Sequence, residues 1–144
     1  MTHYLNTSSS AKRHNDSSGV RAAIVIPAHN EANVIRRCLE SVLQSADKGE
    51  FAITVVCNGC TDDTAAIVRL HFPDVTVIET ATASKTHALN LADSVERIYP
   101  RVYLDADLEI TISSLRSLIE PLKSNEYFIS CGNMYVYTHS SSYV

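Results

Sequence analysis

The stretch "VRAAIVIPAHN" (20–30) decides the fold of this chain. It is a nearly continuous apolar run, rich in β-branched residues, and Pro27 closes it. A short apolar run of this kind is typical of a strand that is buried on both faces. Strands of that type occur in parallel sheets covered by helices on both sides. The sequence therefore predicts an α/β fold with this segment inside the sheet.

Strands and helices are expected to alternate along the rest of the chain. Asn30 is a plausible N-cap for a first helix, in which apolar residues recur at helical spacing from Val34 to Leu43. Further strands are predicted at 51–59, 74–80, 102–105 and 126–137, and further helices at 61–72, 84–100 and 112–121. The last three helices are expected to end at Pro73, Pro100 and Pro121. This alternation predicts a Rossmann-like, mostly parallel sheet with helices on both faces.

Composition indicates one globular domain. The chain has 144 residues, of which 45% are hydrophobic and 19% charged, and its net charge of −4 disfavours a nucleic-acid partner. No apolar run approaches the roughly 20 residues of a transmembrane segment. Residues 1–20 are polar and lack the apolar core of a secretory signal, so we predict a disordered leader (1–20) followed by one domain (21–144). A cytoplasmic location, at most peripheral to a membrane, is expected.

The four cysteines are Cys38, Cys57, Cys60 and Cys131. Without an export signal, reduced structural thiols are the default expectation. The segment "CNGC" (57–60) also fits a redox pair or half of a zinc site. A zinc site needs a second ligand pair, and the sequence offers no second C-x-x-C or H-x₃-H. Redox and zinc roles stay open as alternatives.

Polar clusters follow three of the predicted strands: "PAHNE" (27–31), "CNGCTDD" (57–63) and "DADLE" (105–109). In parallel sheets, ligands bind beyond the carboxyl ends of the strands, where these clusters would meet. Asp105 and Asp107 are carboxylates one residue apart, and carboxylate oxygens suit Mg²⁺ or Mn²⁺. Two aspartates at a strand end are also common as plain surface residues. The convergence of three clusters favours a binding site.

The glycine content restricts how phosphate could be bound. Only four glycines are present, so the chain contains neither a Walker loop nor a G-x-G-x-x-G turn. A nucleotidyltransferase with a related sheet is disfavoured for the same reason, because the first strand is not followed by a glycine-rich loop. A diphosphate would instead depend on a cation at Asp105 and Asp107. Lys85 could add positive charge there or could be a solvated surface residue.

Four ordered segments carry a resemblance to a known family. "IVIPAHNEANVIRRCLESVL", "VVCNGCTDDT", "SKTHALNLA" and "VYLDADLEIT" resemble the amino-terminal half of a family 2 glycosyltransferase with the GT-A fold, over roughly residues 21–115. The resemblance implies that the leading four strands have the spatial order 3-2-1-4. It also implies a nucleotide-diphosphate sugar donor of UDP or GDP type, Mg²⁺ or Mn²⁺ as cofactor, and an acceptor that the sequence does not identify.

The family motifs map onto particular residues of this chain. The resemblance implies a donor site made of Pro27, Ala28, Asn30, Glu31, Asn58, Lys85, Asn90 and Asp105. It implies a metal site at Asp105 and Asp107, with the first aspartate approaching the ribose or sugar and the second holding the cation. The K-x-x-A-L-N motif spans 85–90.

The chain departs from the family pattern in two ways. The usual D-D-G-S after the second strand is Cys57-Asn58-Gly59-Cys60 here, so Asn58 would have to recognise the base through its amide. Family members also continue into a second half that supplies an acidic base and the acceptor pocket. We therefore expect the donor half of an inverting transferase, without a catalytic base, or else a truncated chain that binds nucleotide sugar or is inactive. The strand predicted at 126–137 would expose an edge and favour self-association.

Overall fold

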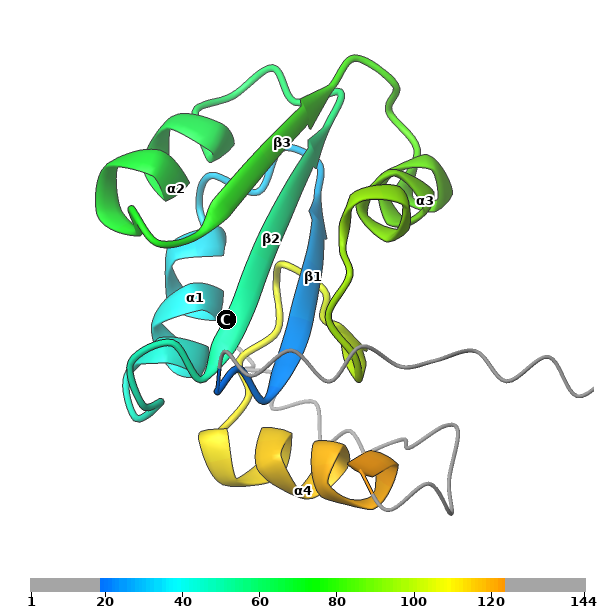
Figure 1. Cartoon of the computed structure of the whole chain (residues 1–144). Helices are drawn as coiled ribbons and strands as arrows, with labels where there is room; N and C mark the ends of the chain where they lie inside the picture. Colours follow the sequence, from blue (N-terminus) through cyan, green and yellow to red (C-terminus); the bar gives the residue numbers. More distant parts are fainter. Residues whose placement is uncertain (1–18, 124–144) are drawn as a thin grey trace, which may run out of the picture.

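A computed structural model describes residues 19–123 of the chain, and Figure 1 shows its arrangement. The central feature is a parallel sheet of four strands in the order β3-β2-β1-β4. The strands are β1 (Ala22–Ala28), β2 (Phe51–Asn58), β3 (Thr76–Thr80) and β4 (Arg101–Tyr103). The α/β class and the predicted order of the leading four strands are confirmed.

Helices cover both faces of the sheet, as predicted. They are α1 (Ile35–Leu43), α2 (Thr64–His71), α3 (Lys85–Val95) and α4 (Ile112–Lys123). Figure 1 shows α1 and α2 on one face, α3 on the other, and α4 below the amino ends of β1 and β2. The carboxyl ends of the strands therefore lie at the opposite edge from α4.

All seven residues of β1 are buried, which explains its nearly continuous apolar sequence. Ile24 and Ile26 point into the larger core, which also contains apolar residues of α1, α2 and α4. Val25 points to the other face, where Ala88 and Ala92 of α3 pack against it. Because successive side chains of a strand alternate between faces, a central strand under two helical layers has no polar position.

Helix α1 has the stripe that its sequence predicts, but it begins later than expected. Its buried residues follow the spacing i, i+3, i+4, i+7: Ile35, Cys38, Leu39 and Val42. Asn30 is not its N-cap, since the helix begins at Ile35 and no side chain caps it. Asn30 has a φ of 56°, and its side-chain oxygen accepts a hydrogen bond from the Thr61 backbone at 2.7 Å. The side chain is thus used to join two loops.

Two helices do not end at the predicted prolines. Helix α3 ends at Val95, ahead of Pro100. The Glu96 carboxylate accepts hydrogen bonds from the backbone N–H groups of Arg97 and Ile98, both at 2.8 Å. These bonds turn the chain out of the helix. Helix α4 continues through Pro121 to Lys123. Pro121 lacks an N–H and so cannot donate to the Ser117 carbonyl, but the helical backbone continues through it to Lys123, the last described residue.

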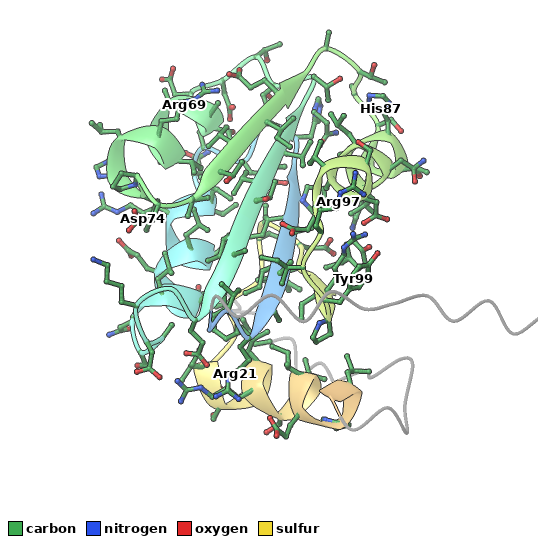
Figure 2. The ribbon with its side chains drawn as sticks, in the orientation of Figure 1. Arg21, Arg69, Asp74, His87, Arg97 and Tyr99 are labelled. Carbon is green, nitrogen blue, oxygen red and sulfur yellow. The ribbon has the colours of Figure 1, made fainter. Side chains whose placement is uncertain are left out.

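A buried carboxylate joins α4 to the amino edge of the sheet. Glu50 precedes β2 and is 6% exposed. Arg116 of α4 donates to both of its carboxylate oxygens at 2.8 Å, and Arg21 lies 2.9 Å from one of them. Figure 2 shows Arg21 beside α4. The hydrogen bonds from Arg116, opposed by burial, lower the pKa of Glu50 from 4.5 to about 2.

Some predictions fall outside the described residues, namely most of the leader (1–20) and the strand at 126–137. Between residues 19 and 123, β4 pairs only with β1. No helix within that range is long and apolar enough to cross a membrane.

Candidate functional site

A pocket of about 240 Å³ lies at the carboxyl ends of the strands. Its lining comes from all three polar clusters and from the first residue of α3: Pro27, His29, Glu31, Asn58, Lys85, Asp105, Ala106 and Asp107. These residues are far apart in the sequence. The parallel sheet brings them together because every strand ends at the same edge.

Six of the predicted site residues line this pocket: Pro27, Glu31, Asn58, Lys85, Asp105 and Asp107. Three others do not. Ala28 is buried in β1, Asn30 binds the loop after β2, and Asn90 lies exposed on α3. Their roles in ligand binding stay predictions.

His29 and Ala106 line the pocket but were not predicted as site residues. The Nδ1 atom of His29 lies 2.6 Å from the Asn58 carbonyl oxygen. A carbonyl only accepts, so Nδ1 carries the proton of this hydrogen bond. The position of His29 inside the 27–31 cluster was the available signal, although a single histidine is a weak one.

The backbone after β4 explains why the two aspartates face the pocket together. The Leu104 N–H donates to the Val25 carbonyl at 3.0 Å and so continues the β1–β4 pairing. Ala106 is 3% exposed and turns inward, whereas Asp105 and Asp107 on either side of it are exposed. The small residue between the aspartates therefore anchors the loop.

Lys85 forms an ion pair with Asp105 inside the site. Lys85 is the first residue of α3, and Ser84 caps that helix by accepting a hydrogen bond from the His87 backbone at 3.2 Å. The ammonium group and the carboxylate are 59% and 50% exposed. Both groups are thus accessible to a ligand.

Asp62 joins the loops that follow β1 and β2. Its carboxylate accepts hydrogen bonds from the backbone N–H groups of Ala32 and Thr64, both at 3.0 Å. The Thr64 hydroxyl in turn accepts from the Glu31 N–H at 2.9 Å. Partial burial raises the pKa of Asp62, but these hydrogen bonds outweigh it and the pKa is lowered. The two loops therefore form one wall of the site.

Gly59 fixes the turn that follows Asn58. Its φ is 63°, its N–H donates to the Thr80 carbonyl at 2.7 Å, and a Cβ at this position would lie 2.7 Å from the Cβ of Ala83. Both its conformation and its surroundings therefore favour glycine.

We expect Gly59→Ala to lower the free energy of unfolding by about 2–4 kcal/mol, from positive φ and steric overlap together. Gly49→Ala is the matched control, because Gly49 has a φ of 74° and nothing within 4 Å of the added Cβ. Urea denaturation of both variants measures the difference. Equal losses of unfolding free energy in the two variants would show that overlap with Ala83 does not contribute to the effect of Gly59→Ala.

The two cysteines of the "CNGC" segment lie beneath this loop. Cys57 is buried in β2, and Cys60 is half-buried with its thiol 3.3 Å from the Ala28 carbonyl oxygen. In the described part of the chain, no three His, Cys, Asp or Glu side chains gather as a metal-binding group. A zinc site at the two cysteines therefore finds no second ligand pair there.

Comparison with known proteins places the chain among sugar transferases. The family described as Glycosyl transferase family 2 matches residues 23–143. Glycosyltransferase AglD of Haloferax volcanii is 29% identical over 127 residues, which are 83% of this chain and 20% of AglD. This chain thus spans about a fifth of that curated relative.

Solved structures share the fold. The mannosyltransferase PcManGT from Pyrobaculum calidifontis, solved with GDP-Man and Mn²⁺, matches with a TM-score of 0.63 and 27% sequence identity. The match covers 69% of this chain and 31% of the PcManGT chain. S. aureus TarS 1-349 matches with a TM-score of 0.63 and 22% sequence identity, and the match covers 71% of this chain and 32% of the TarS chain. TarS 1-349 has also been solved with UDP and with UDP-GlcNAc.

Proposed function

Since this chain belongs to glycosyl transferase family 2, we propose that its pocket binds the nucleotide-diphosphate sugar donor of a glycosyl transfer. The observation that carries the proposal is the joint presence of Glu31, Asn58, Lys85 and the Asp105–Asp107 pair around one pocket. The pocket supplies carboxylates for a cation, an ammonium group for phosphate, and a buried amide for a base. A nucleotide diphosphate presents groups that match all three.

Asp105 and Asp107 are proposed to hold the divalent cation. Two exposed carboxylates fit Mg²⁺ or Mn²⁺, which commonly take one or two carboxylates and complete their octahedral shell with water and phosphate oxygens. Among residues 19–123 no group of three His, Cys, Asp or Glu side chains is placed to hold a metal ion, so water and phosphate oxygens would have to complete the shell. A bound cation would supply charge stabilisation to the leaving diphosphate.

Lys85 is proposed to exchange partners when the donor binds. Without a ligand it neutralises Asp105, and a cation on that carboxylate would repel it toward the diphosphate. The ammonium group then stays near negative charge in both states. Lys85 would thereby favour a site that holds both the cation and the donor over a site that holds a cation alone.

Lys85→Ala is therefore expected to change two affinities in opposite directions. Binding of Mn²⁺ alone should strengthen about threefold because Asp105 loses its competing partner, whereas nucleotide binding in saturating Mn²⁺ should weaken about tenfold. Electron paramagnetic resonance of free Mn²⁺ and calorimetry with UDP and GDP measure the two effects. Lys48→Ala, on an exposed turn, is the control. A parallel decrease in both affinities would contradict the exchange.

Asn58 and His29 are proposed to contact the nucleoside. Asn58 is 4% exposed and lines the pocket at the end of β2. Its amide offers both a donor and an acceptor, where the family pattern has a carboxylate that only accepts. The base preference of this chain is therefore expected to differ from that of members with the acidic pair.

The transfer itself is proposed to be inverting. A base removes the proton of the acceptor hydroxyl, whose oxygen attacks the anomeric carbon on the face opposite the departing diphosphate. The described residues are proposed to hold the donor, and Lys85 together with a cation held by the two aspartates would stabilise the negative charge of the leaving diphosphate. No residue of this chain is assigned as the base, and the acceptor is not assigned. A cytoplasmic location, at most peripheral to a membrane, stays a prediction.

Calorimetry with UDP, GDP, UDP-GlcNAc and GDP-mannose tests the proposal, each with Mn²⁺, with Mg²⁺ and with chelator. We expect binding of at least one nucleotide, and only with a cation. Release of nucleoside diphosphate with and without candidate sugar acceptors then separates transfer from the second candidate, binding without transfer. Failure of all four ligands to bind with either cation would overturn the proposal.

A further inference from the structure

The two thiols of the "CNGC" segment lie near the end of β1, on the same side of the sheet. Cys57 is the Cα partner of Ala28 in the β1–β2 pairing, and the Cys60 thiol donates to the carbonyl of the same alanine. Both side chains belong to, or pack against, the core on the α1 and α2 side of the sheet. Two free thiols therefore lie on the same side of the sheet near Ala28, and the Cys60 thiol is partly accessible.

We propose that Cys57 and Cys60 form a redox pair that closes to a disulfide and thereby weakens ligand binding in the pocket. In the first step the Cys60 thiolate attacks a small disulfide, forms a mixed disulfide and releases one thiol. In the second step the Cys57 thiolate attacks the Cys60 sulfur and releases the second thiol. The protein dithiol loses two electrons and two protons, and the small disulfide is reduced to two thiols.

The link to the pocket is the set of hydrogen bonds that Cys60 makes in its reduced form. Its thiol donates to the Ala28 carbonyl at 3.3 Å, and its sulfur accepts from the Asn30 N–H at 3.4 Å. A disulfide has no S–H group, so the bond to Ala28 is lost on oxidation. Asn58 lies between the two cysteines, and its carbonyl orients His29. Closing the disulfide therefore changes the segment that carries Asn58, and through the Asn58 carbonyl it affects His29 in the loop after β1; both residues line the pocket.

The closing step, in which Cys57 attacks, should depend steeply on pH. Burial, together with Cys60 and Glu79, raises the pKa of Cys57 to about 12, while Arg69 acts in the opposite direction. Glu79 on β3 and Arg69 on α2 are themselves paired at 2.5 Å, so they offset each other near this thiol. Well below its pKa, the thiolate fraction of a group rises about tenfold per pH unit. Closure of the mixed disulfide should accelerate accordingly from pH 7 to pH 9.

Peptide mapping tests the disulfide independently of any ligand. Trypsin cuts after Lys48 and Arg69, so one peptide carries Cys57 and Cys60 without Cys38 or Cys131. After treatment with oxidised glutathione at pH 9, we expect the mass of this peptide to be lower by two hydrogens. At pH 7 we expect the same peptide to carry a glutathione adduct, which is the precursor of the disulfide. In Cys57→Ala the adduct should persist at both pH values. A wild-type adduct that also persists at pH 9 would overturn the proposal.

The effect on the pocket rests on the proposed function and is measured separately. We expect the oxidised protein to bind UDP or GDP with Mn²⁺ about fivefold more weakly than the reduced protein, and dithiothreitol to restore the affinity. Cys57→Ala with the reductant present supplies the control for loss of the thiol alone. Disulfide formation with unchanged affinity would overturn the link to the pocket, whereas absence of binding by the reduced protein would instead contradict the proposed function.

Discussion

Asp107→Ala is expected to abolish the Mn²⁺-dependent binding of a nucleotide-diphosphate sugar and to leave the melting temperature nearly unchanged. The expected loss is at least about a hundredfold in affinity, or about 3 kcal/mol. Asp107 is exposed on a loop whose position depends on the buried Ala106, so its removal leaves no cavity. Two neighbouring carboxylates also repel each other without a cation, so removing one does not weaken the fold.

Asp74→Ala is the matched control for that experiment. Asp74 is an exposed aspartate between α2 and β3, and Figure 2 shows it on the α2 side of the molecule. Calorimetry of wild type and both variants, with Mn²⁺ and with chelator, gives the comparison. Donor binding by Asp107→Ala that equals wild type under both conditions would show that the aspartate is only a surface residue.

Glu50→Gln is expected to lower the free energy of unfolding at pH 7 by up to about 3 kcal/mol. The value follows from the lowering of the Glu50 pKa from 4.5 to about 2 at 1.36 kcal/mol per pH unit. The substitution removes the negative charge that holds Arg116 of α4 and Arg21. The Glu50 side chain is 4% exposed, but Arg116 and Arg21 are 37% and 33% exposed, so water screens the pairs in part and about 3 kcal/mol is the upper end of the expected loss.

The same contact predicts how stability depends on pH. Because folding lowers the pKa of Glu50, its contribution is fully present above pH 4.5 and is lost as the pH falls toward 2. The difference in stability between wild type and Glu50→Gln should therefore shrink across that window in urea titrations. Glu40→Gln is the control, since Glu40 makes an exposed pair with Arg36 at 2.8 Å and should cost about 0.5 kcal/mol or less. A constant difference between pH 7 and pH 3 would contradict this account.

The fold could be predicted from the sequence because its signals are local. The apolar run of β1 and the stripe of α1 each follow from one periodicity, and the alternation of elements leaves few arrangements of the sheet. The helix boundaries could not be predicted in the same way. Glu96 ends α3 through hydrogen bonds that compete with the helix, and Asn30 binds a distant loop. Such side-chain partners are set by tertiary structure.

Most residues of the candidate site that could be predicted lie at or directly after the end of a predicted strand. Glu31, Asn58 and the two aspartates meet because parallel strands share an edge. Lys85 was expected at the start of its helix, and it is the first residue of α3 and lines the same pocket; its role in binding stays a prediction. The sequence did not reveal the Lys85–Asp105 pair or the contact of His29 with the Asn58 carbonyl, because both depend on the separation of loops in space.

The parallel pairing of β1 with β4 has a kinetic consequence. Ala23 pairs with Arg101, so the segment carrying Asp105 and Asp107 joins the sheet only by closing a long stretch of chain. Such a long-range closure is slow compared with the formation of helices. The pocket therefore does not exist in a partly folded chain that lacks this pairing. A bound nucleotide should slow unfolding in stopped-flow experiments and leave the refolding rate unchanged, because it stabilises only the completed sheet.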